Sequence, residues 1–149
     1  MAGAIYGLIL ATSVIAVSAQ NDPDNAGVTA VTVVVTATVF WLAHVYAGVL
    51  AIGHRGRPTW TEARRILDHE WPLAQAGILP TAILLSGALG VLADHRAHDA
   101  AVAACLVELG ATGFVVARAS GVKGLPAVVS GAIALSFGIV VIVLKVAVH

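Results

Sequence analysis

The chain has 149 residues, of which 59% are hydrophobic and only 11% are charged, and its mean hydropathy is +0.95. Ordinary soluble domains carry about 25% charged residues, so this composition excludes an ordinary soluble domain and predicts a protein surrounded by the lipid bilayer. The formal net charge is zero and there is no basic or acidic tail, which argues against nucleic acid as a partner.

Five apolar runs are long enough to cross the hydrocarbon, which takes about 20 residues at 1.5 Å per residue. Clusters of Gly, Pro, Asn, Asp and Ser separate them and favour turns. No Lys or Arg precedes the first run, so we expect a membrane span there rather than a cleaved signal peptide. The sequence predicts an all-α, polytopic membrane helical bundle in a single domain, with spans at about 3–19, 28–53, 72–93, 100–117 and 125–148.

A short amphipathic helix is expected over residues 60–70, between the second and third runs. Thr59 and Glu62 fit a capping box, in which a Thr hydroxyl and a Glu three residues later bind the free backbone N–H groups of a helix start. Tryptophan and arginine at helical spacing suit the headgroup region of a membrane. The expected interfacial anchors are Trp60, Trp71, Arg64 and Arg65.

Basic residues are concentrated in two of the connections, and cytoplasmic connections carry an excess of Lys and Arg. The connection at about 20–27 contains Asp22 and Asp24 without a basic residue. We therefore expect a multi-pass plasma-membrane protein with its N-terminus in the cytoplasm and its C-terminus outside. The basic residues that set this orientation are Arg55, Arg57, Arg64 and Arg65 after the second run, and Arg118 and Lys123 after the fourth.

Glu108 lies near the middle of the fourth run, where insertion scales put the cost of an acidic residue at about +2.5 to +3.5 kcal/mol. Its helical face carries small residues such as Ala104, Ala111 and Thr112, which suit close packing against another helix. We expect Glu108 to be the centre of a buried polar network. The alternative is a protonated carboxyl group that only holds helices together.

His44 is the expected titratable companion of Glu108. It lies close to a stripe of inward-facing residues on the second run, although a single imidazole can also be a packing residue. Pro80 removes one backbone donor in the third run and is the candidate for a gate or kink. The expected ion or proton pathway comprises Glu108, His44, Thr36, Thr112 and Ser136.

The polar segment DHRAHD at 94–99 is expected to form a turn between the third and fourth runs. Arg96 within it opposes a bound cation, so a solvated turn is the alternative to a zinc site. We expect no cofactor, because haem held by His44 would need a histidine from another chain. No GxSxG, HExxH or P-loop pattern favours an enzyme. The weak metal-ligand candidates are Asp94, His95, His98 and Asp99.

Three stretches read FWLAHVYAGVLAIGHR (40–55), LDHEWPLAQAGILP (67–80) and IVVIVLKVAVH (139–149). They resemble a group of small, Ala- and Val-rich, multi-span integral membrane proteins of the kind found in actinobacteria. The resemblance covers most of the chain and implies the class of protein, without a catalytic motif.

Two functional hypotheses follow from these observations. The first is a small-ion or proton channel or transporter built around a Glu108 and His44 network. We expect it to assemble as a homo-oligomer, because 149 residues leave little room for an ion pathway within one chain. The second is a non-transporting structural or accessory subunit, which docks a partner or lipid through the cytoplasmic amphipathic helix.

Overall fold

The computed structural model describes residues 2–53 and 59–148. Arg55 and Arg57, which contributed to the expected orientation, lie outside the described residues. Within the two described ranges the chain forms α-helices and no strand, which confirms the all-α bundle expected from the sequence. The helices are α1 (Ala2–Asn21), α2 (Ala26–Gly53), α3 (Trp60–Gln75), α4 (Ile78–Ala88), α5 (Asp94–Ala119) and α6 (Leu125–Val148).

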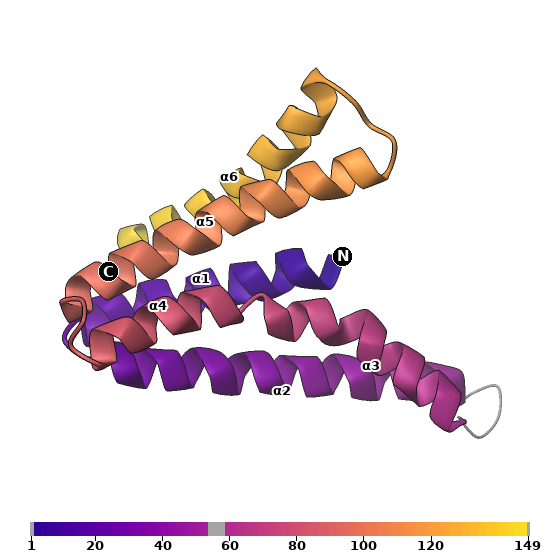
Figure 1. Ribbon diagram of the computed structural model, residues 1–149, viewed down its shortest axis with the longest axis horizontal. Helices are drawn as coiled ribbons and strands as arrows, with labels where there is room; N and C mark the ends of the chain where they lie inside the picture. The colour runs from indigo at the N-terminus through magenta and orange to yellow at the C-terminus, as the bar shows by residue number, and fades with distance from the viewer. Residues whose placement is uncertain (1, 54–58, 149) are drawn as a thin grey trace.

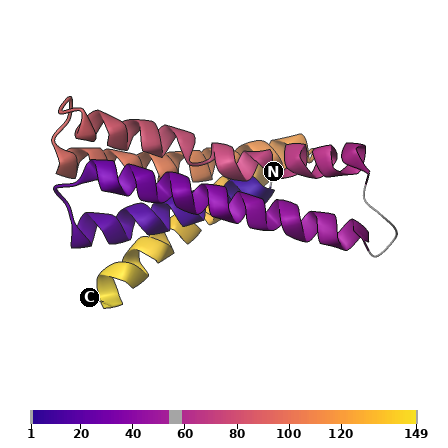
Figure 2. The same cartoon turned by 90° about the horizontal axis from the view of Figure 1, so that it is seen from below.

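Four of these helices, α1, α2, α5 and α6, are long and apolar enough to cross a membrane, so the protein is membrane-embedded. The chain reverses direction after α1, α2, α4 and α5, whereas α3 and α4 run the same way (Figures 1 and 2). The start of α1, the end of α2 and the end of α5 lie toward the same end of the molecule. We name this the basic end, because it carries Arg64, Arg65, Arg118 and Lys123. The opposite, acidic end carries Asp22, Asp24, Asp94 and Asp99, together with Arg96.

The expected third span over 72–93 is wrong as a single helix. α3 continues through Pro72 to Gln75, and only after Ala76 and Gly77 does the 11-residue α4 begin. Pro80 is the third residue of α4 and has no N–H to donate to the carbonyl group four residues earlier, at Ala76, which is the residue that caps the end of α3. Pro80 therefore follows a break between two helices and does not kink one span.

The expected interfacial helix over 60–70 is longer than predicted, and it packs along α2 (Figure 1). Its capping box is present as expected. The Thr59 backbone N–H donates to Glu62 Oε2 at 2.8 Å, and the Glu62 N–H donates to Thr59 Oγ1 at 3.4 Å. The backbone hydrogen bond from Thr59 is the main cause that holds the pKa of Glu62 below its ordinary value.

The segment 94–99 is not a turn, contrary to expectation, because α5 begins at Asp94 and includes all of it. Asp94 in the first turn is favourable at the positive end of the helix dipole, and Ala97, Ala100 and Ala101 are good helix formers. The polar residues of this segment therefore form the first turns of a long helix.

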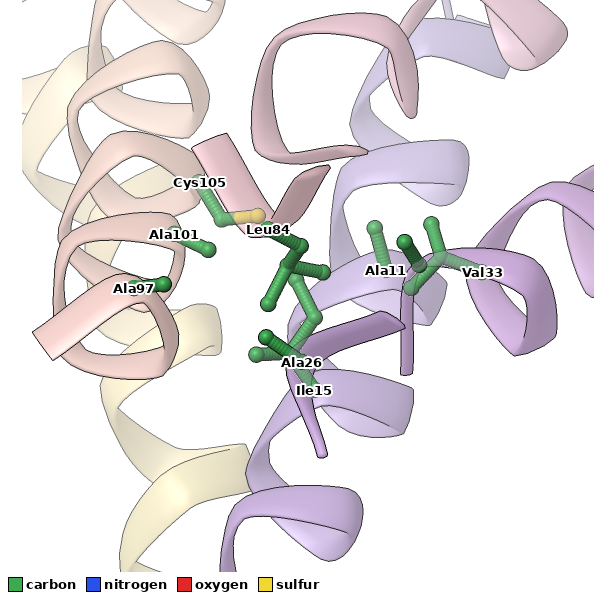
Figure 3. Packing of buried hydrophobic residues seen from close by; sticks show 9 residues of the cluster. Ala11, Ile15, Ala26, Val33, Leu84, Ala97, Ala101 and Cys105 are labelled. Carbon is green, nitrogen blue, oxygen red and sulfur yellow. The ribbon is translucent and has the colours of Figure 1, made fainter. Parts of the chain in front are cut away.

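The core lies where α1, α2, α4 and α5 meet, and small residues let these helices approach closely. In Figure 3, Leu84 of α4 points among Ala97, Ala101 and Cys105 of α5. Ile15 of α1 lies on the other side of Leu84, and all five residues are fully buried.

A cavity around Glu108

Glu108 projects from α5 into a cavity of about 270 Å³ that lies between α1, α3 and α5. The cavity exists because α3 ends at Gln75, while α5 continues along α4 and α1 and separates from α3 toward the basic end (Figure 1). Gly7 brings α1 close to the end of α3, since a Cβ atom there would lie 2.5 Å from the Leu73 carbonyl oxygen. The cavity is lined by Ala4, Leu8, Pro72, Gln75, Ala76, Glu108, Ala111 and Thr112.

The carboxyl group of Glu108 has one oxygen, Oε2, that is buried and has no hydrogen-bond partner within the described residues. Only two other lining side chains, Gln75 and Thr112, are polar, and no lining residue carries a positive charge. An ionised carboxylate in such surroundings is costly unless a cation or a bound proton accompanies it. The arrangement is chemically suited to exchange a proton or a cation at Glu108.

Among the described residues, His44 and Glu108 form no direct hydrogen bond, and the expected network between the two stays a prediction. The Nδ1 of His44 donates to the Phe40 carbonyl oxygen at 2.9 Å, and its ring lies 5.5 Å from that of Tyr6 on α1. His44 therefore belongs to the contact between α2 and the first turns of α1. The stripe on α2 was predicted to face inward, but at this level its inward neighbour is α1 rather than α5.

The other expected pathway residues are also dispersed. Thr36 lines a narrow space between α1 and α2, next to Gly7 and Leu10. The exposed Ser136 donates its hydroxyl to the Ile133 carbonyl oxygen at 2.7 Å, within α6. Of the five expected residues, only Thr112 shares a cavity with Glu108.

His98 is the buried titratable residue that sequence reasoning assigned to a turn. Its Nδ1 donates to the Asp94 carbonyl oxygen at 2.9 Å, and its Nε2 lies 2.9 Å from the hydroxyl of Thr29 on α2. Both side chains are 1% exposed. A signal was present in the sequence, because His98, Ala101, Cys105 and Glu108 follow one another at steps of three and four and so share one face of a helix.

The weak metal candidates do not form a site. His98 turns inward to Thr29, whereas His95 and Asp99 are exposed. Over residues 2–53 and 59–148, no group of three or more His, Cys, Asp or Glu side chains is placed to hold a metal ion.

The expected interfacial anchors divide between two environments. Trp60 is 75% exposed, and Arg64 and Arg65 are exposed one turn later in α3. Trp71 packs edge-on against Trp41 of α2, with 5.8 Å between the ring centroids. Trp71 is still 48% exposed, so both ends of α3 present a tryptophan at the surface.

A larger cavity of about 340 Å³ lies between α2 and the break that separates α3 from α4. Thr38 and Thr81 are its only hydroxyl-bearing residues, and the rest of its wall is apolar. It contains no titratable side chain, so size alone does not make it the better candidate for a functional site.

Comparisons with protein-family models, with curated proteins and with solved structures found no match for this chain.

Proposed function

We propose that the protein is an integral membrane proton transporter in which Glu108 binds and releases the transported proton. The observation that carries this proposal is the buried, unpartnered Oε2 of Glu108 in a cavity without a basic side chain. A residue of this kind inside a membrane helix is a functional candidate by default. A small inorganic ion is less well supported, because Glu108, Gln75 and Thr112 offer few oxygen ligands.

The surroundings of Glu108 favour a transporter over an open channel. Ala4, in the first turn of α1, places the cavity near the basic end. Toward the acidic end the same face of α5 is closed by Cys105 and Ala101, which pack against Leu84. The hydrogen-bonded pair of His98 and Thr29 lies on the acidic side of this apolar contact. In this arrangement a proton on Glu108 can exchange with the basic side of the membrane only. The helices must move before it can exchange with the acidic side.

The test is proton flux into liposomes that contain the purified protein and an internal pH dye, under an imposed pH gradient. We expect Glu108→Gln to abolish the protein-dependent flux, because an amide of the same shape cannot release a proton at neutral pH. Asp99→Asn is the matched control on the same helix, since Asp99 is exposed. Flux of equal size in wild type and Glu108→Gln, or none in either, would remove the proposal.

Two expectations from the sequence continue as parts of this proposal. The basic end faces the cytoplasm, in accord with the excess of Lys and Arg in cytoplasmic connections. The chain is also expected to assemble as a homo-oligomer. Its oligomeric state in lipid stays a prediction that cross-linking in membranes can test.

The second candidate function, docking of an anionic lipid at the basic end, is favoured by the exposed face of α3. Trp60, Arg64 and Arg65 lie together on its first turns, where an aromatic ring and two guanidinium groups suit the headgroup region. We expect phosphatidylglycerol to raise the melting temperature of the detergent-solubilised protein, and the double variant Arg64→Ala, Arg65→Ala to lose most of that rise. An unchanged rise in the variant would exclude this docking site.

A further inference from the structure

We infer that the Glu108 cavity binds an organic ammonium ion, meaning one positively charged nitrogen on an apolar body, in competition with the proton. The inference rests on the proposed function, in that Glu108 must be able to release its proton. The site joins a carboxyl group to a cavity wall that is otherwise largely apolar.

The composition of the wall excludes good coordination of a bare metal cation. Calcium takes six to eight oxygen ligands, and magnesium needs a near-octahedral set. The lining offers oxygens from only three side chains, and Ala, Leu and Pro supply the rest. A tetraalkylammonium centre needs no directed ligands. It needs one opposite charge and apolar contacts, and this cavity supplies both.

The size of the cavity agrees with such a ligand. Its volume of about 270 Å³ is close to the lower end of small-molecule sites, which run from about 300 Å³. Leu8 of α1, Pro72 of α3 and Ala111 of α5 all line the cavity, so an apolar body there would contact three helices. Ligand sites typically have a mostly apolar wall, with a few polar groups that fix the orientation of the ligand.

Other charged groups do not compete for the same place. On α3, Glu70 lies next to Gly3, and its Oε1 is 3.1 Å from His69 Nδ1. On α5, Cys105 contacts Thr12 of α1. The lining of the cavity includes no Lys, Arg or His that would repel the ligand. Glu108 is therefore the counter-charge for an ammonium group in this cavity.

The exchange is balanced without any covalent step to the ligand. The O–H bond of the Glu108 carboxylic acid breaks, its proton passes to water, and the carboxylate that remains pairs with the incoming ammonium ion. One positive charge enters as one leaves, so the cavity stays neutral overall. Binding at a pH where Glu108 is protonated must therefore release up to one proton per ligand.

The experiment is titration calorimetry of the protein in lipid nanodiscs with benzyltrimethylammonium, in two buffers of different ionisation enthalpy. Tetramethylammonium and sodium chloride are the control ligands. We expect saturable binding with proton release, lost in Glu108→Gln and retained in Asp99→Asn. Benzyltrimethylammonium should bind on the order of tenfold more tightly than tetramethylammonium, because its ring is buried against the apolar wall. Equal binding to wild type and Glu108→Gln, or binding of sodium with similar affinity, overturns the inference.

A cavity-filling variant tests the ligand space, and the outcomes for the wild-type protein separate this inference from the proposed function. Ala111→Leu reduces the volume of the cavity, and Ala111 is exposed enough to accept a larger side chain. We expect it to weaken benzyltrimethylammonium binding at least about tenfold, and unchanged binding would contradict a ligand in this cavity. Flux without any ammonium binding in wild type overturns the inference alone. Glu108-dependent binding without flux overturns the proposed transport alone and supports the ammonium site.

Discussion

A single buried hydrogen bond between Thr29 and His98 connects α2 to α5 at the acidic end. Nδ1 of His98 donates to the Asp94 carbonyl oxygen, so in the neutral ring Nε2 accepts from the Thr29 hydroxyl. The Thr29 hydroxyl also lies 3.3 Å from the Asn25 carbonyl oxygen. If the ring becomes protonated, the hydroxyl can donate to that carbonyl oxygen while it accepts from Nε2. The pair can thus be satisfied in either protonation state of the ring.

Replacing Thr29 with Val leaves His98 Nε2 without a partner while keeping the shape of the side chain. Interhelical hydrogen bonds in membranes contribute about 0.6 kcal/mol on average and up to about 1.7 kcal/mol. Because both groups are almost fully buried, we expect Thr29→Val to lower the free energy of unfolding by about 1 to 2 kcal/mol. Unfolding with SDS from dodecyl maltoside micelles measures this, with Thr29→Ser as the control that keeps the hydroxyl. A Val variant as stable as the Ser variant would contradict the assignment.

At the scale of single residues, the sequence identifies Glu108 but not its surroundings. An acid in the middle of an apolar run is conspicuous because of its insertion cost, whatever the tertiary structure. The partner of such a group depends on which helices are neighbours, and helical periodicity does not contain that information. His44 is expected near Glu108 because it lies close to an inward-facing stripe of its helix, whereas in the structure its ring contacts Tyr6. His98 was assigned to a turn because its neighbours are polar.

The capping box of α3 makes the first turn of this helix sensitive to acid. The pKa of Glu62 is lowered from its ordinary value of 4.5, mainly by the Thr59 backbone hydrogen bond. A carboxyl group with a lowered pKa stabilises the folded state above pH 4.5, and this contribution disappears as the pH falls through the folded value. The first turn should therefore loosen only below pH 4.5.

NMR of the Glu62 side-chain carboxyl carbon in micelles should give a titration midpoint below 4.5, accompanied by movement of the Thr59 and Glu62 amide signals toward unfolded positions. Glu62→Gln does not titrate and should show no such change over the same pH range. A midpoint at or above 4.5 would show that the carboxylate does not accept the Thr59 hydrogen bond in lipid mimics.

The contact between α5 and α6 depends on glycine where the two backbones meet. A Cβ atom on Gly131 would lie 2.8 Å from the Gly110 carbonyl oxygen, which cannot turn away as a side chain can. We expect Gly131→Ala to cost about 1 to 3 kcal/mol of stability in the same SDS unfolding assay. Gly53→Ala at the end of α2 is the control, because nothing lies within 4 Å of the position. A loss no larger than that of the control would show that α6 can shift without cost.

At the scale of helices, apolar length predicts α1, α2 and α6 closely but not the region between α2 and α5. Pro72 lies inside α3, and the helix ends only after Gln75, near Pro80. Two prolines eight residues apart indicate that a helix is disturbed, but packing against α1 and α2 decides which of them ends it. The start of α5 was missed for a similar reason, because a polar first turn and a polar loop have the same composition.

The whole molecule has a basic and an acidic end, and its orientation can be tested directly. Cys105 is fully buried, so a Cys105→Ala background removes the native thiol with little loss of volume. In that background, Asp24→Cys and Lys123→Cys place exposed thiols at opposite ends. On intact cells, a membrane-impermeant maleimide should label position 24, whereas position 123 should react only after permeabilisation. The reverse pattern would place the basic end outside.

The helices of this bundle have unequal lengths. α1 has 20 residues and α2 has 28, and the end of α1 adjoins the start of α2 at the acidic end (Figure 1). At 1.5 Å per residue, α2 reaches about 12 Å farther than α1, and the early turns of α3 run beside that extension. A bilayer fitted to α1 therefore leaves the end of α2 and the first turns of α3 at or beyond the headgroups on one side only. A fluorescent nanobody raised against the first turns of α3 would report the orientation of the protein in each vesicle, without any engineered thiol.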